Sequence, residues 1–170
     1  MKKTFFALML MCTSVLAVQA QSMNLTRTAW STMLPGDEEI EMVLNFDDDG
    51  ECYIILTHEE MQDDMIIRMS MSVPGIYSKE GQDLIISFNK KKADVNIDVD
   101  LSNYDSQTRA LMERMLKPEL KKMEPELKKD MLESIPSFLD NVKVVSVNSK
   151  KLVLGDDEGE TITFYPTAKG

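Results

Sequence analysis

Apolar and polar residues alternate with a period of two along most of the chain, which is the pattern of strands with one buried and one solvated face. The clearest case is residues 93–101, where every odd position is apolar and every even position is acidic or an amide. The same alternation occurs at residues 40–46 and 65–73. Shorter apolar runs predict further strands around Trp30 and Ile54 and at residues 84–88, 142–147, 151–154 and 161–165.

Turn-forming residues separate these runs. Polar segments that contain glycine stand at residues 47–50, 79–81 and 156–159, and Pro74-Gly75 follows one of the alternating runs. No segment before residue 102 is long enough for a crossover helix, so a parallel sheet is disfavoured. The pattern therefore predicts a mainly β domain, an antiparallel meander that curls into a barrel or a sandwich.

The alternation ends near Ser102, and a helical insertion is expected at residues 105–139. Pro118 and Pro125 each suit the first turn of a new helix, so we expect successive helical segments here, followed by the last three strands. Asp105 or Ser106 is the expected N-cap. Apolar residues of the insertion recur three and four apart, at Leu111, Met112, Met115, Leu116, Leu127, Met131 and Ile135.

The first twenty residues have the order of a secretory signal peptide. Two lysines precede an apolar run at residues 5–17, and short side chains at residues 18–20 place cleavage after Ala20. The apolar run is too short to cross a bilayer. Met11 is too bulky for a lipoprotein cleavage box ending at Cys12, so soluble export to the periplasm or the medium is expected rather than lipid anchoring.

Charge narrows the classes of partner. The chain has a net charge of −10, and removal of residues 1–20, which hold two lysines and no acid, leaves one domain of 150 residues, 21–170, at −12. This sign argues against binding to nucleic acid or to an anionic membrane surface. Residues 106–139 are the exception, with seven basic and six acidic groups. They form either an ordinary solvated helix face or a basic side that meets an acidic rim, a lipid head group or a partner.

Candidate chemistry is sparse. His58 has no second histidine or thiolate to complete a zinc site. A run with the spacing of calcium-loop ligands comprises Asp94, Asn96, Asp98 and Asp100, with Asp105 beyond it. Val99 stands after the third of these ligands, where such a loop needs glycine, so an extended strand is favoured. Only Cys52 remains after cleavage, which excludes an internal disulfide in the mature chain. We therefore expect no enzyme activity, no catalytic residue, no metal and no cofactor.

A resemblance to a known family rests on several weak motifs spread over residues 25–166. They are Thr28-Ala29-Trp30, Phe46-Asp47-Asp48-Asp49-Gly50, Gly75-Ile76-Tyr77 followed by the segment 81–86, and the closing segments 151–154 and 161–164. The chain resembles the small exported lipocalin-like (calycin-type) domains of Bacteroidetes-type bacteria. The resemblance implies an antiparallel barrel of about eight to nine strands in which Trp30 closes one end. The helical insertion departs from the simplest barrel of this kind.

Two functions follow as alternatives. In the first, the barrel interior binds a small apolar ligand; methionines suit such a pocket because flexible thioethers line adaptable surfaces. In the second, the barrel is filled with its own side chains and binds a protein partner, as an inhibitor or envelope module would, through its acidic surface or residues 106–139. The ligand-binding residues predicted for the first alternative are Trp30, Met42, Leu44, Met65, Met69, Met71 and Ile97.

Overall fold

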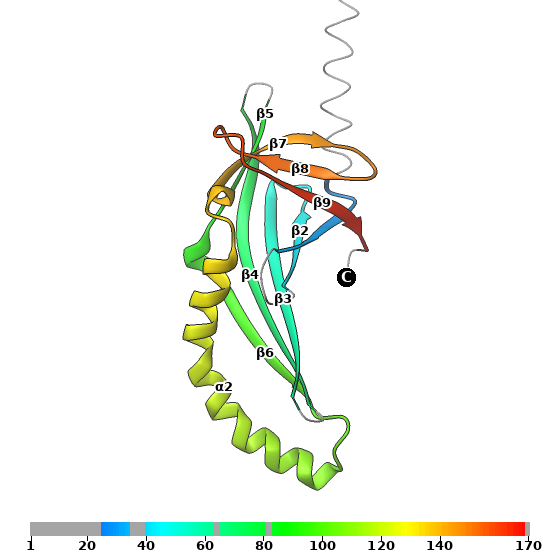
Figure 1. Ribbon diagram of the computed structural model, residues 1–170, viewed down its shortest axis with the longest axis vertical. Helices are drawn as coiled ribbons and strands as arrows, with labels where there is room; N and C mark the ends of the chain where they lie inside the picture. The colour runs from blue at the N-terminus through cyan, green and yellow to red at the C-terminus, as the bar shows by residue number, and fades with distance from the viewer. Residues whose placement is uncertain (1–24, 35–39, 63–64, 81–82, 169–170) are drawn as a thin grey trace, which may run out of the picture.

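The computed structural model describes residues 25–34, 40–62, 65–80 and 83–168 (Figure 1). The predicted signal peptide lies outside these residues. The strands are β1 (Ala29–Met33), β2 (Glu41–Phe46), β3 (Glu51–Gln62), β4 (Met65–Glu80), β5 (Asp83–Phe88), β6 (Asp94–Asp100), β7 (Asn141–Val147), β8 (Leu152–Gly155) and β9 (Thr161–Thr167). The helices are the short 3₁₀ turns η1 (Lys90–Lys92) and η2 (Ser137–Asp140) and the long α-helix α2 (Ser106–Ser134).

Eight of these strands close into an antiparallel barrel. The hydrogen-bonded order is β3-β2-β1-β9-β8-β7-β5-β4, and pairing of β3 with β4 completes the ring. The ninth strand, β6, pairs with β4 alone. Because α2 comes between β6 and the last three strands, the predicted fold class and the place of the helical insertion are both confirmed.

β3 and β4 extend well beyond the closed part of the barrel. They contain 12 and 16 residues, against 4 to 7 in the other strands. One edge of β4 pairs with β3 over residues 65–76, whereas its other edge pairs first with β6 and then with β5. β3, β4 and β6 therefore form a three-stranded extension, here called the ribbon, that projects from one end of the barrel (Figure 1).

The turn predicted at Pro74-Gly75 is wrong, because β4 runs through both residues. The Pro74 carbonyl accepts a hydrogen bond from the amide of Asn89, so the ring nitrogen points to the same edge of β4. At that edge the pairing with β6 ends at Ser72 and the pairing with β5 begins at Gly75. The missing N–H of proline therefore falls in a gap between partners and costs the sheet no ladder bond.

The closed part of the barrel is filled by its own side chains. Inward-facing residues of the strands form one core with the end of α2 and with η2, whose Leu139 is buried completely. The largest fully buried side chains are Trp30, Phe46, Phe164, Leu25, Met42, Leu44, Ile54, Leu56, Met71, Ile86, Leu139 and Leu152.

The expectation of two successive helical segments is also wrong, because α2 is one continuous helix with both prolines inside it. Asp105 caps it, accepting hydrogen bonds from the backbone amides of Gln107 and Thr108 and from the Thr108 hydroxyl. Pro118 and Pro125 are both exposed, so the two carbonyls that lose their helical donors can bond to water. Figure 1 shows α2 curving beside the ribbon, as prolines in a helix cause.

Candidate functional site

The structure divides the seven predicted ligand-binding residues into two groups. One group belongs to the packed core, where each side chain is at most 1% exposed: Trp30, Met42, Leu44 and Met71. The other group, Met65, Met69 and Ile97, lies on the ribbon and is half-buried. The indole Nε1 of Trp30 has no hydrogen-bond partner among the described residues, which fits an apolar core position.

Alternation along the ribbon strands defines its inner face. Leu56 and Met71 are buried in the barrel core, and side chains two residues apart share a face. The same face therefore continues along β4 through Met69, Ile67 and Met65, and along β6 through the paired residues Ile97 and Val99. All five side chains are only half-buried. The apolar face of the sheet thus leaves the core and remains partly accessible to solvent.

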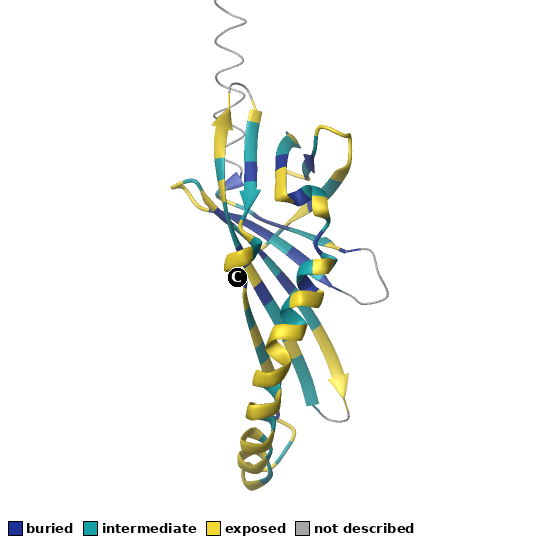
Figure 2. Cartoon of the chain, turned by 90° about the vertical axis from the view of Figure 1, so that its left-hand side faces the viewer, coloured by how far each residue is buried: buried dark blue, intermediate teal, exposed yellow. Residues whose placement is uncertain are grey.

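α2 has an apolar stripe that leaves the same core. The residues of this stripe are Met112, Leu116, Leu120, Met123, Leu127 and Met131. On a helix of 3.6 residues per turn, these six positions lie within about 100° of one another around the helix axis. Met131 is buried in the core and Leu127 packs against it. Toward the N-terminus of α2 the stripe becomes accessible, and Met123 is 52% exposed. Figure 2 shows this change from buried to exposed along α2.

These two apolar surfaces are here called together the inner surface. It comprises Met65, Ile67, Met69, Ile97 and Val99 of the ribbon and Met112, Leu116, Leu120 and Met123 of α2. At the barrel end it is bounded by the core residue Met131 and by Lys128, whose Nζ donates to the backbone carbonyl of Ala93 at the start of β6.

The edge of the inner surface along β3 is polar. His58, Glu60 and Gln62 pair with Met69, Ile67 and Met65 and share their face of the sheet. On the opposite face Arg68 donates to Glu59 at 2.5 Å, and this hydrogen bond raises the pKa of the guanidinium. The ribbon therefore combines an apolar strip on β4 and β6 with a hydrogen-bonding strip on β3.

Three of the nine inner-surface residues, Met65, Met69 and Ile97, are among the predicted ligand-binding residues. The alternation at residues 65–73 already marked Ile67, and the alternation at 93–101 marked Val99. Helical spacing also marked Met112 and Leu116. No single sequence pattern showed that β3 and β4 extend beyond the closed part of the barrel. Their apolar face therefore continues where no opposing barrel wall covers it.

A second apolar patch lies on α2 outside the stripe. Leu111 and Met115 are one helical turn apart and are 60% and 65% exposed. Met115 lies about 80° around the helix from Met123. An exposed Leu and Met patch on this helix is the feature that the protein-binding alternative predicts.

Two sequence candidates for chemistry, the Cys52 thiol and the acidic run of residues 94–100, lie within the part of the chain that the structure describes. Burial raises the pKa of the Cys52 thiol to about 12, with a further contribution from Asp47, so this thiol remains protonated and is a poor nucleophile. Asp94, Asp98 and Asp100 belong to β6, an extended strand as predicted. Over the described residues, no group of three or more His, Cys, Asp or Glu side chains could hold a metal ion.

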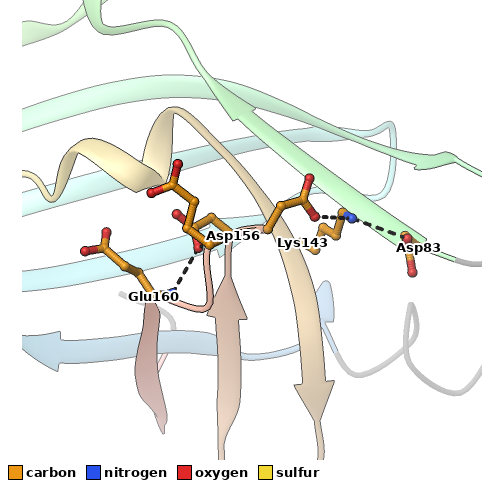
Figure 3. Close-up of polar contacts among 6 residues, drawn as sticks. Asp83, Lys143, Asp156 and Glu160 are labelled. Carbon is orange, nitrogen blue, oxygen red and sulfur yellow. Dashed lines mark hydrogen bonds and ion pairs between the residues drawn. The ribbon is translucent and has the colours of Figure 1, made fainter.

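An open hollow of about 530 Å³ lies on the outer wall of the barrel beside Lys143. The Nζ of Lys143 is 2.6 Å from Asp157 and 3.9 Å from Asp83, and the hydrogen bond to Asp157 raises the lysine pKa. Figure 3 shows Lys143 beside Asp83 and, in the neighbouring turn, Asp156 beside Glu160. Lys143 thus pairs with Asp83 and Asp157, and Glu80 is the remaining charged residue of the lining.

No family model matches this chain, and no curated protein matches it. In the described part of the chain, no helix has both the length and the apolar character needed to cross a membrane. The antiparallel eight-stranded barrel is compatible with the lipocalin-like fold that the sequence motifs resemble.

Proposed function

We propose that this is an exported lipocalin-like protein that binds an elongated apolar molecule, such as a single acyl chain, against the inner surface. The observation that carries the proposal is the half-buried state of Ile67, Met69, Ile97 and Val99, which continue the core along the ribbon. The sequence-based hypothesis put the apolar ligand inside the barrel. Because the barrel is filled, we place the ligand on the ribbon instead.

The energetics favour such an occupant. Full burial of an Ile, Leu or Met side chain is worth about 1.5–3 kcal/mol, so completing the burial of each half-buried side chain contributes about 0.5–1 kcal/mol. Each methylene of the ligand that leaves water adds about 0.8 kcal/mol. The sum over the inner surface and a chain of ten or so carbons exceeds the cost of association by enough for micromolar binding.

The shape and chemistry of the surface favour a long ligand with one polar end. The apolar residues follow two strands and a helix lengthwise, and methionines adapt to chains of different shape. His58, Glu60 and Gln62 on β3 would offer hydrogen bonds to a hydroxyl, amide or ester group beside the apolar strip. The proposal includes no catalysis.

Export is part of the proposal because a carrier of apolar molecules is useful in an aqueous compartment. The order of charged, apolar and small residues at 1–20 supports it. Expression of the full chain in a bacterial host, followed by intact-mass measurement of the periplasmic protein, should give a chain that starts at Gln21. Retention of residues 1–20 in the cytoplasm would contradict this part of the proposal.

The binding test compares two methionines on the same helix. Met123→Gln places a polar group on the inner surface, whereas Met115→Gln makes the same change about 80° around the helix. With the neutral fluorescent probe N-phenyl-1-naphthylamine, we expect micromolar binding that weakens about tenfold in Met123→Gln and in Ile97→Asn. Met115→Gln should bind like the wild type.

Failure of the wild type to bind the probe would contradict the proposal, as would equal weakening in the Met123 and Met115 variants. Mass spectrometry of small molecules that co-purify with the wild type gives an independent measurement. We expect an apolar compound that is lost from Ile97→Asn and kept in Met115→Gln.

The second candidate function, binding of a protein partner, is favoured by the exposed Leu111 and Met115. A photo-reactive amino acid at position 115 should then cross-link one defined envelope protein, and Leu111→Gln should abolish this cross-link without changing probe binding. A cross-link pattern unaffected by Leu111→Gln would contradict this candidate.

A further inference from the structure

A large hollow lies on the outer wall of the barrel, where the edge of β4 changes partner from β6 to β5. Its volume is about 900 Å³, within the range of ligand pockets, although it opens to solvent. It exists because the chain leaves β4 between Phe88 and Asp94 to form η1. Neither predicted function uses this hollow.

One wall of the hollow is apolar. Pro74 and Ile76 project outward from β4, and Tyr53 lies beside them on β3. Ile76 is 63% exposed, although the other two side chains are half-buried. An exposed isoleucine at the centre of a concave surface is a site where a ligand would gain apolar contact.

The other wall is basic, in a chain whose net charge is −10. η1 consists of three lysines, Lys90, Lys91 and Lys92, and all three line the hollow. The turn is fixed in place, because the amide of Asn89 donates to the Pro74 carbonyl at 2.7 Å. The lysines therefore stay at one end of the apolar wall instead of moving with a free loop.

Charge is distributed unevenly over the hollow. Lys90 pairs with Asp140 at 2.7 Å, whereas no salt bridge of the described residues involves Lys91 or Lys92. Glu51 is the remaining carboxylate of the lining, and it lies on β3, across β4 from the lysines. With strands about 4.8 Å apart, this places Glu51 two strand spacings away. The lysine end is thus the anion-attracting end.

We propose that this hollow binds an anionic amphiphile: a molecule with an apolar body of about ten carbons and one terminal carboxylate or phosphate. The apolar body lies against Ile76, Pro74 and Tyr53, and the anion lies between Lys91 and Lys92. The hydroxyl of Ser72, which also lines the hollow, offers a donor to the anion's oxygens.

This site is independent of the inner surface. Pro74 and Ile76 project from the outer face of β4, whereas Met69 and Met71 project from its inner face. A ligand at one site therefore contacts none of the side chains at the other, and the two proposals can fail separately.

The test uses decanoate, which has both an apolar chain and an anionic end. Decanol has the chain alone, whereas acetate and inorganic phosphate have the anionic group alone. Binding is measured by calorimetry and by shifts of isoleucine methyl signals in NMR spectra of the purified protein. We expect decanoate to shift Ile76. We also expect acetate and phosphate to leave this signal unchanged, because neither supplies an apolar body.

The variant Lys91→Gln/Lys92→Gln should weaken decanoate binding at the Ile76 signal about five- to tenfold, since each exposed ion pair contributes a factor of two or three. Lys150→Gln/Lys151→Gln is the matched control, because it removes the same charge at the β7–β8 turn. It should leave the affinity unchanged. Decanol should bind this site more weakly than decanoate, and 0.5 M salt should weaken decanoate alone.

Each other outcome overturns the proposal. If decanoate and decanol bind equally at Ile76, Lys91 and Lys92 do not bind the anion. The same conclusion follows if the two double-lysine variants weaken decanoate binding equally. Shifts caused by phosphate or acetate alone show a simple ion site. Shifts confined to Ile67 and Ile97 assign decanoate to the inner surface and leave this hollow empty. Neither variant changes a core side chain, so loss of folding does not confuse the comparison.

Discussion

Replacing Met131 by alanine tests whether the end of α2 is a structural part of the barrel. Met131 is 4% exposed and belongs to the barrel core, whereas Met115 on the same helix is 65% exposed. Met131→Ala and Met115→Ala are therefore the same chemical change in the same helix, and they differ only in burial.

The expected loss follows from the atoms removed. Truncation to alanine deletes three heavy atoms, and at about 0.8 kcal/mol for each methylene-sized group the transfer contribution is about 2.4 kcal/mol. A residual cavity of about 40 Å³ adds about 1 kcal/mol at about 24 cal/mol per Å³. The free energy of unfolding should therefore fall by about 3 kcal/mol in Met131→Ala. The exposed Met115→Ala should change it by less than about 0.5 kcal/mol.

Urea unfolding followed by fluorescence gives the measurement. Trp30 is the single tryptophan of the chain and is 1% exposed, so its emission reports the integrity of the core without any label. A thermal scan should show a midpoint about 6–12 °C lower for Met131→Ala. Equal midpoints for the two variants would refute the reasoning, since they would show that α2 does not pack into the barrel.

Three further predictions concern other parts of the structure. Gly75→Ala should destabilise the protein by about 1–3 kcal/mol in the same assay, because a Cβ there would lie 2.7 Å from the Phe88 ring and 2.8 Å from the Ser87 carbonyl; an unchanged midpoint would contradict this. Cys52 should resist alkylation by iodoacetamide at pH 8 until urea unfolds the chain, since its pKa is raised to about 12 and its side chain is buried; rapid labelling of the folded protein would contradict this. The Thr108 hydroxyl and the backbone amides hold the pKa of the Asp105 cap carboxyl below its usual value, so the cap stabilises α2 at neutral pH and this contribution is lost as pH falls through the lowered pKa. Helical circular dichroism should decline less at low pH in Asp105→Asn, which caps without titrating.

The strands could be predicted because side chains on their two faces differ in polarity. Residues 93–101 are the clearest example, and β6 occupies Asp94–Asp100. Pro74-Gly75 failed as a turn because local turn chemistry does not show that β4 changes partner at that point. The gap between partners that tolerates Pro74 depends on two segments distant in sequence.

The continuity of α2 was missed for a similar reason. Pro118 and Pro125 each remove one backbone hydrogen bond, which sequence reasoning interprets as a break. Both prolines lie on the solvent side of the helix, and Asp105 and Met131 fix its two ends, so tertiary contacts override the local signal. The inner surface was missed in part because helical spacing shows which residues share a face but not whether another element covers that face.

Stability and the proposed binding are located in different parts of this molecule. The closed barrel buries Trp30, Phe46 and Phe164 completely and needs no ligand to complete its core. The ribbon and the first two-thirds of α2 add apolar surface that the core does not use, and Met123 remains 52% exposed. The other residues of the inner surface are half-buried, so each keeps part of its apolar side chain in contact with solvent. Because these residues lie on two elements that leave the same core, we propose that an apolar occupant completes their burial.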